Sequence, residues 1–563
     1  MIDDPYLLGG PQSHDFWAES VAEAILDRDP DDPIVIKGGI SPSGVPHLGN
    51  MNEIARGYFV AEALRDRGRA VRQIFTADDR DPLRKLPRKL ADLDGNIVDL
   101  GDVNAGALGR NLGKPYTAIP DPFGCCDSYG AHFSNLIERS ADALGIDVEM
   151  VSNTECYESG KFEDVTRYLL EHREQARSVL SNYQDKVDDD YVPFRPICEE
   201  CGHVTETDAV RSVDLDSGTV EYVCTDIEAG DRVIEGCGHE GTATLREGKL
   251  PWRFEWPAQW NVLNVDFEPF GKDHAEGSWP SGADITRNVL EDIPPVPMAY
   301  EWFTLDGKPF SSSEGHVIMV QDVLEFLEPE VLRYFFTKNP TRARDFSIER
   351  ADQLVDEFDR FEEVSSGLPM MFVGSINQEE REHTERIYRY VVEDIDESLC
   401  SLVLESDDEH PIRLPYTFAA VLGMTDDREL REAMARRENH LPDDASEDEI
   451  ENALARVNYA RTWAERTDNA YNYRLEEDLP SIDFESDVAA ALSELADFVT
   501  EGHGGDPIQS EIFETAREHD LDPGDLFTAG YRLFFGTEQG PKLGPFLAEL
   551  DREFVVRRLR REG

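Results

Sequence analysis

Lysine is scarce in this sequence. Only 11 of its 55 basic residues are lysines, and 117 acidic residues leave a formal net charge of −62. So acidic a composition is typical either of a disordered chain or of a folded protein adapted to concentrated salt, in which dense carboxylates keep the surface hydrated. Hydrophobic residues make up 40% of the chain and occur along its whole length, which favours the folded, halophile-like alternative. The charge of a partner cannot be deduced from such a total.

Other absences narrow the class of protein. No apolar run approaches the length of a membrane-spanning helix, so we expect no contact with a membrane. The opening residues MIDDPYLLGG have neither the basic nor the apolar part of a signal peptide, and we expect a cytoplasmic protein. Eight cysteines in 563 residues are too few and too clustered for a disulfide scaffold. Metal binding is their expected use.

The alternation of apolar segments predicts the fold. Strands are predicted at 33–37, from residue 70, at 147–153, at 267–274 and at 297–305. Helices are predicted at 52–66, 132–146 and, as one long helix, 161–183. Strands that alternate with helices indicate an α/β fold with a doubly wound parallel sheet, interrupted by a cysteine-bearing insertion at about 194–245. From about residue 370 to the end, the sequence predicts an all-α domain.

The segment IVIKGGISPSGVPHLGN, residues 34–50, changes abruptly from a β-branched run to glycine, proline and histidine. In a parallel sheet, ligands bind beyond the carboxyl ends of the strands. Gly38 and Gly39 allow a ligand to approach the main chain, and the prolines stiffen the turn. His47 and Asn50 then stand at the start of a helix, whose positive end favours phosphate. We expect a phosphate-binding turn; taken alone, an ordinary strand-to-helix loop is the alternative.

Several segments carry a resemblance to a known family. PSGVPHLGN resembles the HIGH signature of class I aminoacyl-tRNA synthetases, and GKPFSSSEGHVI at 307–318 resembles their second, KMSKS-type loop. TADDRDPLRKLP, PDPFGCCDSYGAHF, KLPWRFEWPAQW, FEPFGKDH and PPVPMAYEW narrow the resemblance to the class I lysyl-tRNA synthetases of archaeal type. The segments run in order over roughly residues 30–345.

The resemblance implies the domain organisation. A Rossmann-type catalytic domain would occupy residues 1–305, with a metal-binding insertion at about 115–245. The KMSKS-type loop and a helical connecting domain would follow at 306–368, and a helical anticodon-binding domain at 369–563. The last domain carries no motif of its own and is assigned by position.

The resemblance also implies the activity and its residues. The expected reaction is ATP-dependent ligation of L-lysine to tRNA(Lys) through lysyl-adenylate, by a monomer, with Mg²⁺ accompanying ATP. The implied catalytic residues are His47, Asn50, Lys308, Ser311 and Ser312. The implied ATP contacts are Pro42, Ser43, Gly44, His47, Gly49, Asn50, Pro309, Phe310, Ser311, Ser312 and Ser313. The implied lysine contacts are Gly39, Ser41, Trp252, His274 and Tyr300, although tryptophans in such segments are also typical of a core. A class I synthetase for another amino acid such as glutamate, and a tRNA-binding homologue without catalysis, are the alternatives.

The second loop departs from the family pattern. Pro309 and Ser312 stand where the pattern has lysines, and Glu314 stands where relatives often carry another. Either Lys308 supplies the missing charge from a shifted position, or backbone amides and hydroxyls bind the phosphates instead. A cluster of scarce basic residues after the second strand is a candidate contact for ATP phosphates or the acceptor end of tRNA: Arg84, Lys85, Arg88 and Lys89.

Two clusters are candidate zinc sites. Cys198 and Cys201 form a CxxC knuckle, and Cys224 and Cys237 would complete a set of four thiolates, with His239 as the competing fourth ligand. The second cluster offers a carboxylate, two thiols and an imidazole within twelve residues, from Asp121, Cys125, Cys126 and His132. Buried free thiols are the alternative for the second cluster.

Overall fold

The structure, a computed structural model, describes residues 16–185, 187–188, 190–230, 232–310, 316–366, 378–392, 411–476 and 478–562. The chain divides into two compact units. The first comprises Met1–Asp322, Arg333–Phe346 and Arg389–Ile395, and the second comprises Val323–Leu332, Ser347–Tyr388 and Asp396–Gly563. Among the described residues, the structure contains no helix that is both long enough and apolar enough to cross a membrane.

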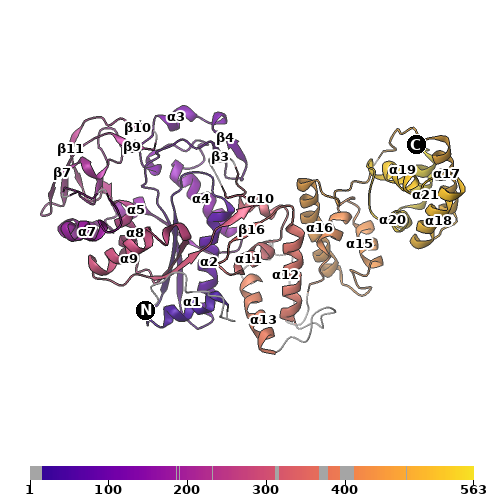
Figure 1. The fold of residues 1–563 in the computed structure, drawn as a ribbon, viewed down its shortest axis with the longest axis horizontal. Helices are drawn as coiled ribbons and strands as arrows, with labels where there is room; N and C mark the ends of the chain where they lie inside the picture. Colours follow the sequence, from indigo (N-terminus) through magenta and orange to yellow (C-terminus); the bar gives the residue numbers. More distant parts are fainter. Residues whose placement is uncertain are drawn as a thin grey trace. The chain divides into compact units, whose positions relative to one another are not determined.

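A five-stranded parallel sheet forms the centre of the first unit (Figure 1). In spatial order its strands are β14 (Val296–Tyr300), β13 (Phe267–Gly271), β1 (Ile34–Ile40), β2 (Val71–Ala77) and β5 (Glu149–Ser152). β1 pairs with β2 over its whole length, from Ile34 opposite Val71 to Ile40 opposite Ala77. Because the chain continues from β1 to β2 on one side and returns to β13 on the other, the topology reverses at β1. Ligands bind at such a reversal, beyond the carboxyl ends of the strands.

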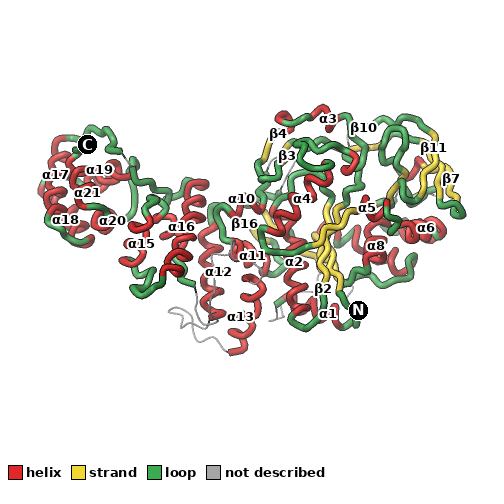
Figure 2. Tube along the Cα trace, turned by 180° about the vertical axis from the view of Figure 1, so that it is seen from behind, coloured by secondary structure: helices red, strands yellow, loops and turns green. Residues whose placement is uncertain are grey.

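Helices cover both faces of the sheet, which confirms the predicted doubly wound α/β fold. In Figures 1 and 2, α2 (Leu48–Arg65) lies on one side, and α8 (Trp252–Leu263) lies on the other. α1 (Trp17–Leu26) packs on α2, and α9 (Ser278–Asn288) packs on α8. Gly57 allows α2 to approach the sheet, because a Cβ atom there would lie 2.9 Å from the Gln73 side chain and 3.2 Å from Ile36.

Two predicted elements are each divided in the structure. The helix predicted at 161–183 forms α6 (Glu163–Glu171) and α7 (Arg173–Leu180), because His172 between them has a ψ of 25° and leaves the helical conformation. The strand predicted at 297–305 forms β14 and β15 (Phe303–Leu305), and β15 pairs with β16 (Arg344–Phe346) instead of joining the central sheet. Between β14 and β15, the Glu301 amide donates to the Pro340 carbonyl at 2.7 Å, and the chain turns there.

The cysteine-bearing insertion leaves and rejoins the first unit at one place. β6 (Arg195–Pro196) pairs with β12 (Gly248–Lys249), and these two-residue strands close the insertion at its base. Between them lie a three-stranded antiparallel sheet and a hairpin. The sheet has the order β11 (Glu240–Thr244), β8 (Thr219–Val223) and β7 (Val210–Asp214), and the hairpin pairs β9 (Ile227–Ala229) with β10 (Arg232–Ile234). The insertion has a small core, in which Cys198 and Cys224 are buried beside Phe194, Val220 and Tyr222.

Shorter elements surround this framework. The strands β3 (Lys89–Ala91) and β4 (Ile97–Asp99) form a hairpin, which α3 (Ala105–Gly109) follows. α4 (Tyr129–Asp142) and α5 (Asn153–Glu158) flank β5 along the chain. α10 (Val320–Leu324) and α11 (Pro329–Thr337) follow the second signature loop.

The described part of the second unit is helical, as predicted. Its helices are α12 (Ala351–Ser366), α13 (Gln378–Val392), α14 (Tyr416–Leu422), α15 (Arg428–Arg437), α16 (Glu447–Thr467), α17 (Ser486–Thr500), α18 (Gly505–Glu518), α19 (Pro523–Phe535), α20 (Leu543–Glu549) and α21 (Arg552–Arg560). Its interior includes a buried cation, Arg456. The Arg456 guanidinium donates to Glu328 at 2.6 Å, to both carboxylate oxygens of Asp359 at 2.7 and 2.8 Å, and to the Leu414 carbonyl at 3.0 Å.

Candidate active site

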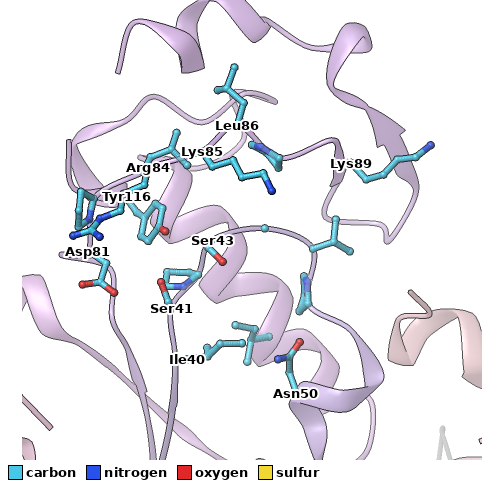
Figure 3. A pocket seen from close by; sticks show the side chains of 18 of the residues that line it. Ile40, Ser41, Ser43, Asn50, Asp81, Arg84, Lys85, Leu86, Lys89 and Tyr116 are labelled. Atoms are coloured by element: carbon cyan, nitrogen blue, oxygen red, sulfur yellow. The ribbon is translucent and has the colours of Figure 1, made fainter. Parts of the chain in front are cut away.

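A cavity of about 740 Å³ lies where the sheet topology predicts a ligand, beyond the carboxyl ends of β1 and β2 (Figure 3). One wall is the turn after β1, residues 40–47, together with Asn50 of α2. The facing wall is the loop at residues 81–89, which follows β2. The remaining lining residues are Tyr116, Ile137, Arg195 and Trp252. The cavity therefore lies between two of the segments that carry the family resemblance, PSGVPHLGN and TADDRDPLRKLP.

The predicted site residues are placed unequally around this cavity. Seven of them line it: Ser41, Pro42, Ser43, Gly44, His47, Asn50 and Trp252. Those outside its lining are Gly39, Gly49, His274, Tyr300, Lys308, Pro309 and Phe310. Ser311, Ser312 and Ser313 fall outside the residues that the structure describes. Lys308 is exposed in a tight turn, in which its amide and carbonyl both bond to Leu305.

His47 is held at the junction of the two signature segments. Its ring stacks on Phe310, with centroids 4.9 Å apart and an angle of 15° between the planes. The next amide, that of Leu48, donates to the Ile318 carbonyl at 2.8 Å, and the His47 amide donates to Asn50 Oδ1 at 2.9 Å. Burial lowers the pKa of His47 to about 4, so the imidazole is neutral at neutral pH. A neutral ring can hold a phosphate oxygen by a hydrogen bond without carrying charge.

Glycine at position 49 makes room for that ring. A Cβ atom on Gly49 would lie 2.8 Å from His47 Nδ1 and 2.9 Å from Cε1. His47 Nδ1 is buried and has no hydrogen-bond partner among the described residues. Gly49 therefore acts on the site through the position of His47, although it does not line the cavity.

The remaining predicted substrate residues fall into two pairs. Trp252 stacks on Trp256 at 5.3 Å, and the ring of His274 lies 6.1 Å from Trp252. Gly39 and Tyr300 lie at the carboxyl ends of β1 and β14, two strands that β13 separates. Both donate to the same side chain, Glu53, which accepts the Gly39 amide at 3.1 Å and the Tyr300 hydroxyl at 3.2 Å.

Glu53 was missed by the sequence analysis. It lies on α2 three residues after Asn50, on the same side of the helix, and that spacing was the available signal. Burial and the neighbouring carboxylate of Glu268 raise the pKa of Glu53 to about 8. The negative charge of Glu268 is balanced by Lys37, whose Nζ donates to it at 2.7 Å. The carboxylate also accepts hydrogen bonds from the indole N–H groups of Trp256 and Trp260.

Asp78, the first residue after β2, is a second buried carboxylate that the sequence analysis did not single out. It accepts hydrogen bonds from Asn153 at 2.7 Å and from Gln259 at 3.0 Å. Burial, followed by the charges of Asp81 and Glu255, raises its pKa to about 8. Lys249 is occupied elsewhere, because it pairs with Asp81 and with Glu255. Among the described residues, Glu53 and Asp78 are therefore bonded by neutral donors and have no ion pair.

Four cysteines of the insertion meet at one point. Cys198, Cys201, Cys224 and Cys237 have sulfur atoms within 4.8 Å of one another. The competing ligand, His239, instead donates from Nε2 to the Glu199 carboxylate at 2.9 Å. Four thiols at this spacing suit a tetrahedral metal ion.

The second predicted cluster also assembles. Asp121, Cys125, Cys126 and His132 bring their ligand atoms within 4.8 Å of one another. His132 Nε2 bonds to the Ala91 carbonyl at 2.8 Å, which directs Nδ1 toward Cys125, 3.3 Å away. A carbonyl that orients the other nitrogen of a ligand histidine is typical of metal sites. The donor atoms of both clusters therefore fit a metal ion.

Comparison with known proteins identifies the family. The sequence profile of the family described as tRNA synthetases class I (K) matches residues 15–394. The chain belongs to this family of class I synthetases. It is 67% identical to a lysine–tRNA ligase of Halobacterium salinarum, over 100% of this chain and 99% of that protein. It is 62% identical to a lysine–tRNA ligase of Haloarcula marismortui over the full length of both, and 32% identical to one of Thermococcus kodakarensis over 97% of this chain and 99% of the relative.

Proposed function

We propose that this protein is a lysine–tRNA ligase of class I, which joins L-lysine to tRNA(Lys) for translation. Membership of the class I (K) family and 67% identity over the whole chain to a lysine–tRNA ligase carry the proposal. The site supports it independently, because the cavity has a turn suited to phosphate, and among the described residues the nearby carboxylates of Glu53 and Asp78 have no ion pair. A cytoplasmic monomer is the expected form.

The first chemical step is activation of lysine. The lysine carboxylate attacks the α-phosphate of ATP, pyrophosphate leaves, and lysyl-adenylate forms without any proton transfer. Catalysis of such a step depends on positioning and on stabilising charge at the phosphates. His47, Asn50 and the turn at residues 42–44 hold ATP, and Gly49 keeps the His47 ring in place. Mg²⁺ bound with the nucleotide would neutralise part of the phosphate charge.

In the second step, a hydroxyl of the terminal ribose of tRNA attacks the carbonyl carbon of the adenylate. The ester bond forms, the bond to AMP breaks, and the hydroxyl proton is released. Because the leaving group is a phosphate ester of low basicity, this step also depends on orientation of the two reactants. We assign the helical region at 369–563 to recognition of the anticodon and the region at 306–368 to the connection, in keeping with their positions in the chain.

Lysine recognition is explained by Glu53 and Asp78. Lysine brings two ammonium groups, and a buried ammonium needs a carboxylate partner. Glu53 and Asp78 are two such carboxylates without an ion pair in the described structure, at the carboxyl ends of the strands. Trp252, His274, Ser41, Gly39 and Tyr300 would complete the contacts. Glutamate would add a second carboxylate instead of a second ammonium, so the charge of the site favours lysine.

We further propose that each cysteine-containing cluster holds Zn²⁺. Zinc prefers four ligands drawn from thiolate, imidazole and carboxylate, which are the donors present in both clusters. When bound, the metal supplies no chemistry to the reaction and acts as a cross-link. It would hold the insertion, whose own core is small, and the loop that precedes α4.

The direct test is ATP–pyrophosphate exchange in concentrated KCl with each of the twenty amino acids, with and without tRNA. We expect lysine alone to support exchange. Exchange driven by a different amino acid would retain the synthetase and discard lysine as its substrate. Absence of exchange under every condition, in a protein that still binds tRNA, would favour the homologue without catalysis.

A further inference from the structure

The described lining of the cavity is mainly basic, whereas the chain as a whole is strongly acidic. Over the whole sequence, acidic residues outnumber basic ones by 117 to 55. Among the residues that the structure describes, the cavity lining contains one acidic residue, Asp81, and five basic ones, which are Arg84, Lys85, Arg88, Lys89 and Arg195. In a protein with so few basic residues, this concentration in one cavity points to an anionic ligand.

Three of the five basic side chains are already engaged. Arg84 and Arg195 both donate to Glu206, at 3.0 and 3.1 Å. Lys89 pairs with Asp99 at 2.8 Å. Lys85 and Arg88 are exposed, and in the part of the chain that the structure describes neither forms an ion pair. Two cations of the cavity wall are therefore available to a ligand.

The loop that carries Lys85 is held firmly on both sides. Leu83 and Leu90 are buried, and the Leu83 amide and carbonyl bond to Lys114 and Gly113 at 3.0 and 2.8 Å. Farther along, the Arg88 carbonyl accepts the Leu100 amide at 3.0 Å. In Figure 3 the Lys85 side chain extends from this wall toward the cavity, and Ser43 and Asn50 lie on the facing wall. Lys89 points outward in the same view.

The second signature segment leaves a need for such a cation. Pro309 stands at one of its usual lysine positions, and Lys308 is not part of the cavity lining. Pyrophosphate gains negative charge as it leaves during activation, and a positioned cation is the common means of stabilising it. The cavity wall can supply what this segment lacks.

We propose that Lys85, together with Arg88, binds the β- and γ-phosphates of ATP from the wall that faces His47. The inference rests on the proposed function in one respect, that ATP is the substrate. In class I synthetases of the usual pattern, lysines of the second signature supply this positive charge. Here the loop after β2 supplies it. This assignment also explains how the reaction proceeds with proline at position 309.

The test compares ATP with AMP as ligands of the full-length protein. Dissociation constants are measured by calorimetry in concentrated KCl, without lysine or tRNA, for Lys85→Met, Lys85→Arg and the double variant Lys85→Met/Arg88→Gln. We expect Lys85→Met to weaken ATP binding at least about tenfold, the scale of a lost charge-assisted hydrogen bond, and to leave AMP binding unchanged. Lys85→Arg should restore ATP binding, and the double variant should lose more.

The matched control is Lys161→Met, which removes an exposed lysine of the same unit that does not line the cavity. It should leave both affinities unchanged. The proposal is overturned if the double variant binds ATP as the wild type does. It is also overturned in favour of an RNA contact if ATP affinity is intact and only the KM for tRNA rises. Failure of the proposed function is distinguishable, because wild-type protein would then bind ATP through Lys85 but show no exchange with lysine.

Discussion

The ring of His47 lies against the ring of Phe310, at 4.9 Å between centroids, and this stack joins the two signature segments of the site. The Leu48 amide reinforces the junction through its bond to the Ile318 carbonyl. His47 follows β1, and Phe310 directly precedes the serines of the second loop. The position of the signature histidine is therefore coupled to the segment that leads into the second loop, and neither can move far alone.

The first prediction concerns the space around His47. Gly49→Ala would place a Cβ atom 2.8 Å from His47 Nδ1 and 3.6 Å from Phe310, the ring that stacks on His47, so the substitution crowds the stacked pair. We expect the rate of pyrophosphate exchange to fall roughly a hundredfold, because displacement of a positioning group by about an ångström costs that much. Steady-state exchange measures the loss. Gly101→Ala is the control, since a Cβ atom there meets nothing within 4 Å; equal rates for the two variants would contradict the packing described.

The second prediction concerns Glu53 and the pH. Its pKa of about 8 means that the carboxyl is mostly protonated at pH 7 in the free protein, and an ammonium ligand must displace that proton. Lysine affinity should rise with pH up to about 8, with proton release on binding, detected by calorimetry in buffers of different ionisation enthalpy. Glu53→Gln should reduce the proton release to the part contributed by Asp78, whose pKa is also raised to about 8, and should weaken lysine binding by about 2 to 5 kcal/mol.

The same raised pKa affects stability. Because folding favours the protonated form of Glu53, its contribution is fully present below the ordinary pKa of 4.5 and is lost as the pH rises through about 8. Bound lysine should offset that loss.

The matched control for the lysine-binding measurement is Glu138→Gln, on the exposed side of α4. This variant should bind lysine with the same pH dependence as the wild type. Proton release as large in Glu53→Gln as in the wild type would exclude Glu53 as an ammonium partner.

The third prediction concerns metal content. Protein purified without chelators should contain two zinc ions per chain, one for each group of ligands. Cys198→Ser and Cys125→Ser should each lose one ion, as measured by elemental analysis, and Cys198→Ser should also lower the thermal stability of the insertion. Cys156→Ser alters a buried cysteine that belongs to neither cluster, and it should retain both ions. Loss of metal from all three variants alike would indicate general unfolding instead of ligand removal.

The fourth prediction concerns the helical unit. Arg456→Met removes a buried guanidinium that Glu328 and Asp359 surround, and leaves those carboxylates without their cation. We expect the unfolding free energy of the second unit to fall by about 3 to 5 kcal/mol. Thermal and denaturant unfolding followed by circular dichroism measures the change. Arg517→Met breaks only an exposed pair with Glu514 and should alter stability by less than about 0.5 kcal/mol.

Local patterns in the sequence were sufficient for much of the fold and for both groups of candidate metal ligands. The β-branched run at Ile34 and the CxxC at Cys198 are signals carried by neighbouring residues, and their structures follow from short-range rules. Long-range partners were not predictable in the same way. Glu53 and Tyr300 are 247 positions apart, and no local pattern in either segment predicts their hydrogen bond. The turn at Glu301 likewise depends on a bond to the distant Pro340 carbonyl.

The short ladder between β6 and β12 has a consequence for how the sequence can change. Arg195 of β6 lines the cavity, and Lys249 of β12 pairs with Asp81, which lines it as well. Most residues enclosed between these strands can vary in length and composition, because the chain re-enters the unit where it left; Glu206 is an exception, since Arg84 and Arg195 of the cavity donate to it. The two closing positions have no such freedom, since Arg195 lines the cavity and Lys249 pairs with a residue that lines it. Natural variation should therefore be wide from 197 to 247 outside the thiols and Glu206, and should stop sharply at the two ends of this range.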